Sequence, residues 1–204
     1  MRSAPPTKED TITELTEEQL EDLEVEVVVN IEFEIGQSVV YPHHGAGKVL
    51  KKEMKEVLGE SREYLTIKIL HNDMTVMVPT QNAAVAGLRP IIDEQTCQKV
   101  LAVLQDECSE MPKNWNRRFK HNRDKIKTGD IYELAEVVRN LAIREAEKGL
   151  STGEKQMFTR AKKILASELM YALEMDEDEV DQHLHSILIE QHGGAPATVA
   201  VATD

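Results

Sequence analysis

The residues best suited to contact another molecule lie in one short stretch, from Lys113 to Lys127. It holds Trp115, the single tryptophan of the 204-residue chain, with seven Lys or Arg residues and one acid, Asp124. An aromatic ring among cations suits nucleic acid, because cations pair with phosphates while the ring wedges against a base step. A half-buried tryptophan that anchors one helix fits the pattern equally well. The pattern alone leaves both interpretations open.

No arrangement of catalytic residues accompanies this stretch. The sequence contains no GxxxxGK[ST], GxGxxG, HExxH or GxSxG motif. The adjacent His43 and His44 could suggest a metal, but neighbours on a strand point in opposite directions, and no second pair with ligand spacing completes a site. We therefore expect no enzyme activity, no metal and no cofactor.

Composition limits the class of protein further. Apolar residues make up 41% of the chain and aromatic residues only 4%, so we expect a mainly aliphatic core. No apolar run is long enough to cross a membrane, and the N-terminus lacks the pattern of a secretory signal. Cys97 and Cys108 are expected to be buried thiols in a reducing compartment. These features predict a cytoplasmic protein without membrane contact.

The net charge of −13 is concentrated at the two ends of the chain. Residues 1–34 carry a net charge of −9 and residues 174–204 a net charge of −8, which leaves residues 35–173 with +4. A local DNA contact is therefore compatible with the acidic total, whereas indiscriminate coating of DNA is not expected. We expect the acidic ends to compete with DNA for the cationic stretch, so that deletion of residues 1–30 tightens non-specific DNA binding at low salt.

The elements that position these residues fall into two groups. Between Phe33 and Pro79, short β-type runs are separated by Gly, Pro and Asn turns, which predicts a small, curved SH3- or Tudor-like barrel. Such modules bind partners through a strand edge or an exposed face. The expected strands are Ser38–Tyr41, the run after Gly45-Ala46-Gly47 to Val57, Glu63–Ile69 and Met74–Val78.

After Pro79 the sequence is predicted to be helical throughout. Asp93 is suited to cap the first helix, and the box formed by Ser151 and Glu154 starts a later one. In the second helix, Trp115, Arg118 and Asn122 fall on one side. The expected helices cover residues 93–107, 114–127, 130–148, 151–175 and 176–191.

Together these patterns predict an α+β protein, with an N-terminal Tudor/SH3-like small β-barrel followed by an all-helical C-terminal domain. The expected division of the chain is an acidic disordered extension (1–30), the barrel (31–90), the helical domain (91–190) and a flexible tail (191–204).

Two groups of residues resemble the CarD/CdnL family of bacterial transcription regulators. They occur in the family's order, and the likeness covers about residues 31–175. The first group, in the barrel, is Gly36, Val39, Val40, Tyr41, Pro42, His43, His44, Gly45 and Ala46, then Glu63-Tyr64-Leu65, Thr75-Val76 and Val78-Pro79. The second, in the helices, is Asn114-Trp115, Arg117-Arg118-Phe119-Lys120, Ala135–Leu141, Gly149-Leu150-Ser151 and Gly153-Glu154-Lys155.

The resemblance implies a factor that binds RNA polymerase holoenzyme at promoters. In this family the Tudor-like module, shared with the transcription-repair coupling factor, docks on the lobe of the polymerase β subunit. The helical domain wedges a tryptophan into the minor groove at the upstream edge of the bubble and stabilises the open complex. By position, the implied DNA-binding residues are Trp115, Arg117, Arg118, Lys120, His121 and Arg123, and the implied polymerase-binding residues are Lys55, Val57 and Met77.

Two positions depart from the family pattern. Gln37 replaces the Asp that commonly follows the Gly, and Met77 stands where relatives often carry Arg, which calls the ionic part of the β-lobe contact into question. We expect RNA polymerase and promoter DNA as partners of a monomer that reaches the nucleoid through RNA polymerase. The alternative is a protein–protein adaptor on RNA polymerase without direct DNA contact.

Overall fold

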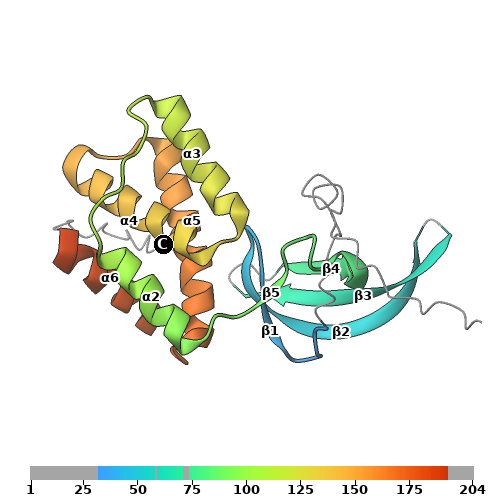
Figure 1. The fold of residues 1–204 in the computed structure, drawn as a ribbon. Helices are drawn as coiled ribbons and strands as arrows, with labels where there is room; N and C mark the ends of the chain where they lie inside the picture. The colour runs from blue at the N-terminus through green and yellow to red at the C-terminus, as the bar shows by residue number, and fades with distance from the viewer. Residues whose placement is uncertain (1–31, 58, 71–73, 193–204) are drawn as a thin grey trace, which may run out of the picture.

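The computed structural model of the chain describes residues 32–57, 59–70 and 74–192. The predicted disordered extension and nearly all of the predicted tail lie outside these residues. The described part consists of a curved β-sheet and a bundle of helices (Figure 1). It confirms the predicted α+β fold with a Tudor-like module followed by a helical domain.

The sheet is antiparallel, with the strand order β4-β3-β2-β1-β5. A register shift between Val49 and Lys51 interrupts the pairing of β2 with β3 and helps the long hairpin to curl. Alternate residues of the strands, including Leu65, Ile67 and Ile69, fill the core of the module. The strands are β1 (Ser38–Tyr41), β2 (Gly45–Val57), β3 (Glu60–Ile69), β4 (Thr75–Pro79) and β5 (Arg89–Pro90).

The segment after Pro79 does not follow the prediction. It is not helical at once, because a short 3-10 turn, η1 (Thr80–Asn82), leads into irregular chain and then into β5. Strand β5 pairs with Val39 and Val40 of β1. A two-residue strand carries no periodicity that a sequence could display, so only the closure of the sheet reveals it.

The helices begin where their capping residues predict. The side chains of Asp93, Asn114, Asp130 and Ser151 each accept a hydrogen bond from a backbone N–H of the first turn, and Ser151 and Glu154 form the predicted capping box. The helices are α2 (Glu94–Gln105), α3 (Trp115–Thr128), α4 (Ile131–Lys148), α5 (Thr152–Ala172) and α6 (Glu177–His192).

Aliphatic side chains of α2, α4, α5 and α6 form the second core. Cys97 belongs to it, as predicted, but Cys108 lies exposed in the loop between α2 and α3, so the prediction of two buried thiols is wrong for Cys108. No helix in the described ranges combines the length and the apolarity needed to span a membrane.

The turn between β1 and β2 docks the sheet onto the helices. Pro42 lies against Gly129, which caps α3 in the left-handed conformation at φ 77°, and a Cβ at Gly129 would come within 3.0 Å of the Pro42 ring. The amide of Ala46 donates to the buried Ser167 Oγ at 2.9 Å. The C-terminus of α3 therefore lies beside β1, and the N-terminus of α3 points away from the sheet (Figure 1).

A buried carboxylate strengthens this junction. Glu168 on α5 is almost completely buried and accepts hydrogen bonds from Arg89 of β5, with 2.9 Å between Arg89 Nη2 and Glu168 Oε2. The amide of Ile92 donates to the same carboxylate at 3.2 Å. A buried charge needs such partners, so sheet and helices are joined by more than apolar contact.

Candidate nucleic-acid interface

Trp115 begins α3 and keeps 43% of its surface exposed. It lies outside the apolar core of the helical domain. Its ring stacks on Phe119, one turn further along the helix, with 5.3 Å between the ring centres and 25° between the planes. Its indole N–H donates to Ser151 Oγ at 2.9 Å. The ring is thus held in one orientation from two sides while part of it stays open to a partner.

Ser151, whose side chain accepts the hydrogen bond from the indole, is also the N-cap of α5. Ser151 Oγ accepts from the Glu154 amide and donates to the Glu154 carboxylate at 2.8 Å, besides accepting from Trp115. Glu154 is almost completely buried. Sequence analysis identified this capping box but not its contact with the tryptophan, since nothing in the spacing links residues 115 and 151.

Arg118 completes this network. Its burial contradicts the prediction that it binds DNA. Only 4% of it is exposed, and its Nε donates to Glu154 Oε1 at 2.7 Å. Its Nη1 donates to the carbonyls of Pro112 and Lys113. Because a phosphate contact would break this buried pair and leave Glu154 with only the longer contact to Arg144, 3.8 Å away, the structure assigns Arg118 to the fold.

The network also sets the ionisation of Glu154. Burial acts to raise the pKa of this carboxyl, but the hydrogen bonds from Arg118 and Ser151, together with the charge of Arg118, outweigh burial and hold the pKa below its usual value. Glu154 is therefore a stable anion that fixes the position of Arg118 beneath Trp115.

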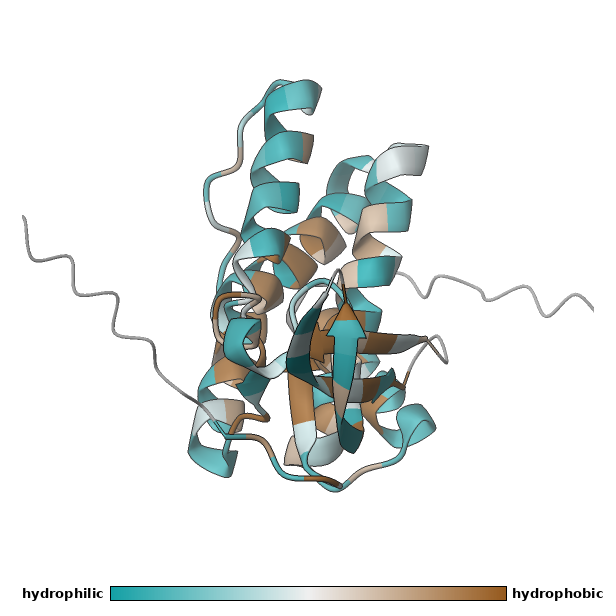
Figure 2. Ribbon diagram, turned by 90° about the vertical axis from the view of Figure 1, so that its right-hand side faces the viewer, coloured by the Kyte–Doolittle hydropathy of each residue, from teal (hydrophilic) through white to brown (hydrophobic). Residues whose placement is uncertain are grey.

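The other predicted DNA-binding residues lie on the outer surface of α3. Arg117, Lys120 and Arg123 are exposed, whereas His121 is half-buried. This helix, which reaches the top of both ribbon views, is coloured mainly as hydrophilic (Figure 2). The structure thus brings a fixed ring and exposed cations together on one helix.

Helix α5 adds cations that sequence analysis did not single out. Lys155 and Arg160 are exposed on this helix, which begins beside Trp115. Their spacing of five residues is not the i, i+3 or i, i+4 spacing of neighbours on one helical face, so periodicity gave no signal for them. Lys155 also pairs with Glu145, with 3.1 Å between Nζ and Oε1.

The predicted polymerase-binding residues lie together on the sheet. In the register, Lys55 pairs with Arg62 and Met77 with Thr66, so Lys55, Val57 and Met77 share the outward face of β2, β3 and β4. Lys55 Nζ lies 2.9 Å from Met77 Sδ. Val57 and Met77, which are 44% and 52% exposed, give this face an apolar part beside the ion pair of Lys55 with Glu53. We call Lys55, Val57 and Met77 the β-face.

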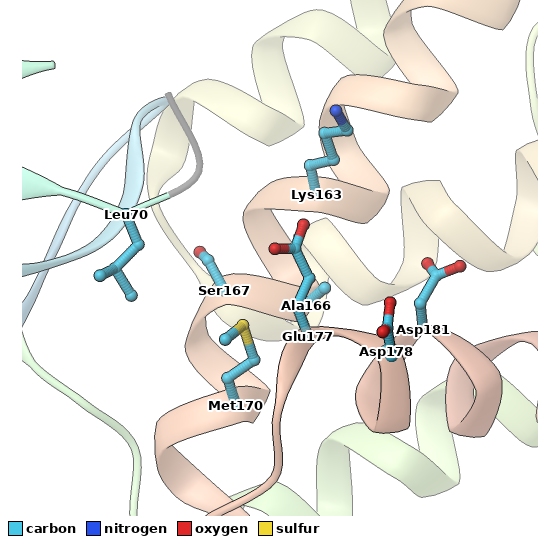
Figure 3. Close-up of a pocket in the computed structure, with 8 residues that line it drawn as sticks. All are labelled: Leu70, Lys163, Ala166, Ser167, Met170, Glu177, Asp178 and Asp181. Carbon is cyan, nitrogen blue, oxygen red and sulfur yellow. The ribbon is translucent and has the colours of Figure 1, made fainter. Parts of the chain in front are cut away.

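A cavity between the sheet and helices α5 and α6 has mainly acids among its charged lining residues, and its negative charge does not suit nucleic acid. Its volume is about 250 Å³, and it lies between Leu70 at the end of β3, helix α5 and the start of α6. Figure 3 shows Lys163 near the three acids Glu177, Asp178 and Asp181 around this space. Three carboxylates against one lysine would repel a phosphate.

The adjacent histidines lie in the turn between β1 and β2. The ring of His44 stacks on Tyr41 with 5.2 Å between centres, and His43 adopts a positive φ of 66°. Within the described residues, His, Cys, Asp and Glu side chains form no group that could hold a metal ion.

Comparison with known proteins places the chain in a family. Residues 33–92 match a protein-family model described as "CarD-like/TRCF RID domain", and residues 99–185 match one described as "CarD, C-terminal domain". A protein of Bacillus subtilis (strain 168) named "Putative transcription factor YdeB" is 42% identical over 137 residues, which cover 67% of this chain and 90% of that protein. The two matched segments follow each other as the sheet and the helices do, and the chain belongs to the CarD family.

Proposed function

We propose that this chain stabilises the promoter open complex by docking its β-face on the β-subunit lobe of RNA polymerase and wedging Trp115 into the minor groove. The general role in transcription follows from the family. A CarD-like/TRCF RID domain implies an interaction with RNA polymerase, and the Bacillus relative is named as a transcription factor. Regulation of transcription through RNA polymerase is therefore the role of the chain, and the wedge is its proposed mechanism.

The observation that carries the wedge is the fixed, half-open ring of Trp115. Its hydrogen bond to Ser151 and its stack on Phe119 restrict the ring before any partner binds, so little side-chain entropy remains to be lost on contact. Apolar side chains that enter the minor groove partly unstack a base step. The exposed Arg117 and Lys120 are placed on the same helix to hold the flanking phosphates.

The proposed polymerase contact uses the opposite end of the molecule. The β-face presents Val57 and Met77, whose exposed apolar surface suits a protein partner. Met77 cannot form an ion pair, so the ammonium of Lys55 beside it, which pairs with Glu53 at 2.9 Å, supplies the polar part of this contact, while the lysine stem adds to its apolar part.

Two weak contacts on one rigid body explain why the factor acts at promoters. One ring and a few cations give weak affinity with little sequence preference. Docking on polymerase makes the DNA contact intramolecular and raises its effective concentration. The junction of Arg89 with the buried Glu168 keeps the two contact surfaces at a fixed separation. Since the wedge is made only with the open state, its binding shifts the population without any chemical energy.

The decisive experiment measures the lifetime of open complexes formed by the cognate holoenzyme with wild type, Trp115→Ala and Tyr132→Ala. Tyr132 on α4 is a matched control, because its ring is also exposed and also lies in the helical domain. We expect wild type and Tyr132→Ala to prolong the lifetime, and Trp115→Ala to bind polymerase without prolonging it. Circular dichroism checks that each variant is folded.

Equal lifetimes with folded Trp115→Ala and wild type would contradict the wedge. In that case the chain is an adaptor on RNA polymerase without direct DNA contact. An unfolded Trp115→Ala would place the ring among the structural residues, although it lies outside the apolar core.

A further inference from the structure

A cleft opens where the turn between β1 and β2 meets α3 and α5. Its volume is about 440 Å³, within the range of small-molecule sites. The apolar part of its lining comes from Phe119 and Ile126 on α3 and from Met157 on α5. Phe119 and Ile126 are only partly buried, whereas Met157 belongs to the buried core, so a flat ring could pack mainly on Phe119 and Ile126 with Met157 at the floor of the cleft.

The polar part of the lining combines three cations with two histidines and Gln156. Arg123 and Lys127 of α3, Arg160 of α5 and the two histidines of the turn all border the cleft, and no acidic residue of the described chain does. Among the described residues, neither Lys127 nor Arg160 is paired with a carboxylate. Positive charge that no carboxylate of the described residues neutralises, beside an apolar surface, suits a ligand that carries both phosphate and a ring.

The turn that closes the cleft is held in an unfavourable conformation. His43 adopts φ 66°, a left-handed value that residues other than glycine rarely take. Arg160 Nη2 donates to the His43 carbonyl at 3.0 Å and so ties this turn to α5. Strained backbone of this kind is concentrated at binding sites, where the surrounding structure maintains it.

We propose that this cleft is a nucleotide-binding site, in which the base packs on Phe119, Ile126 and Met157 while Lys127, Arg160 and Arg123 bind the phosphates. The nucleotide has two possible sources: a free nucleoside polyphosphate, or one unpaired nucleotide of a single DNA strand. The site does not require the wedge, since binding of a nucleotide to the cleft is measurable without polymerase or promoter. Failure of this proposal would therefore leave the proposed function untouched.

The test uses the full chain and calorimetric titration with GTP, guanosine, inorganic triphosphate and a short single-stranded thymidine oligonucleotide. We expect GTP to bind more tightly than guanosine or triphosphate, because base and phosphate each contribute. Trp115 stacks on Phe119, which lines the cleft, so its fluorescence should change on binding.

Variants then locate the bound nucleotide. Lys127→Gln should weaken binding by about tenfold, the loss expected for one charge-assisted hydrogen bond. Lys163→Gln removes the same charge from a position on α5 that does not line the cleft, and should change affinity by less than about twofold. Arg160→Gln should also weaken binding, although it also releases the turn at His43.

Three results decide whether the cleft binds a nucleotide and whether that nucleotide is free or part of a DNA strand. Binding of GTP that depends on Lys127 supports a free nucleotide as the ligand. Binding of the oligonucleotide alone, with the same dependence on Lys127, supports an unpaired nucleotide of DNA. The proposal is overturned if neither binds, if triphosphate binds as tightly as GTP, or if Lys127→Gln and Lys163→Gln behave alike.

The titration of His43 gives an independent readout. Burial lowers the pKa of His43, a hydrogen bond to the Ile126 backbone acts to raise it, and the charges of Arg160 and Lys127 lower it further. Phosphate bound between these cations would offset their effect, so the pKa of His43 measured by NMR should rise when GTP binds. An unchanged titration with GTP bound would place the nucleotide elsewhere.

Discussion

The two proposed contact surfaces differ in how their side chains are held. The β-face consists of Lys55, Val57 and Met77 on neighbouring strands of a curved sheet, and two of these three residues are apolar. The surface of α3 consists of one ring and separate cations on a single helix. An apolar face suits a protein, whereas spaced cations around a ring suit a polyanion.

The difference extends to what lies beneath each surface. The β-face lies on a sheet that covers a mainly aliphatic core, whereas Trp115 lies beside a network that contains the buried carboxylate of Glu154 and the buried Arg118. The orientation of the Trp115 ring therefore depends on the ion pair between Arg118 and Glu154, whereas the orientation of the β-face depends on the register of its strands. Substitutions should separate these two dependences.

The largest effect is expected from Arg118→Ala. Removal of one partner from a buried ion pair costs up to about 3–5 kcal/mol, and Arg144, 3.8 Å from the Glu154 carboxylate, offsets only part of this loss. The adjacent Arg117 is exposed, so Arg117→Ala should change stability by less than about 0.5 kcal/mol. Urea unfolding followed by circular dichroism compares the two variants, and equal stability would refute the assignment of Arg118 to the fold.

Acid should weaken the same network. The pKa of Glu154 is held below its reference value of 4.5, so its contribution to stability is present above that pH and is lost as the pH falls through the folded-state pKa. The free energy of unfolding of wild type should therefore decline below about pH 4.5. Glu154→Gln should be less stable at neutral pH and should decline less on acidification. A parallel decline of both proteins would show that other carboxylates dominate.

An intermediate effect is expected at the β-face. Met77→Asp places a charge on an apolar contact and should reduce affinity for RNA polymerase by at least about tenfold, or about 1.4 kcal/mol. Val85→Asp is the control, since Val85 is also an exposed apolar residue of the β module, 88% exposed, but lies outside the β-face. Binding assays with core polymerase would contradict the assignment if both variants bind like wild type.

The smallest effect is expected from single cations of α3. Lys120→Gln should weaken binding to promoter DNA about uniformly across sequences and reduce the slope of log affinity against log salt by about one. Lys148→Gln, which removes an exposed lysine at the end of α4, should leave the slope unchanged. A slope that is the same for Lys120→Gln and wild type would remove Lys120 from the DNA contact.

Local rules predicted most of the elements in this chain. Four helices begin at the capping residues Asp93, Asn114, Asp130 and Ser151, because capping involves only neighbouring residues. Strands with alternating apolar residues were found for the same reason. Strand β5 was missed, since its two residues are defined by their pairing with β1 and by nothing in their own sequence.

The sequence by itself determined that a tryptophan among cations would begin a helix and that a curved β module would precede the helical domain. Only the tertiary structure decided that Arg118 is buried and Arg117 exposed, because Glu154, which selects between them, lies 36 residues further along the chain. The hydrogen bond of Trp115 to Ser151 and the cleft between the β1–β2 turn, α3 and α5 have the same origin. Each depends on contacts between segments that are distant in the sequence, and only the packing of the folded chain brings these segments together.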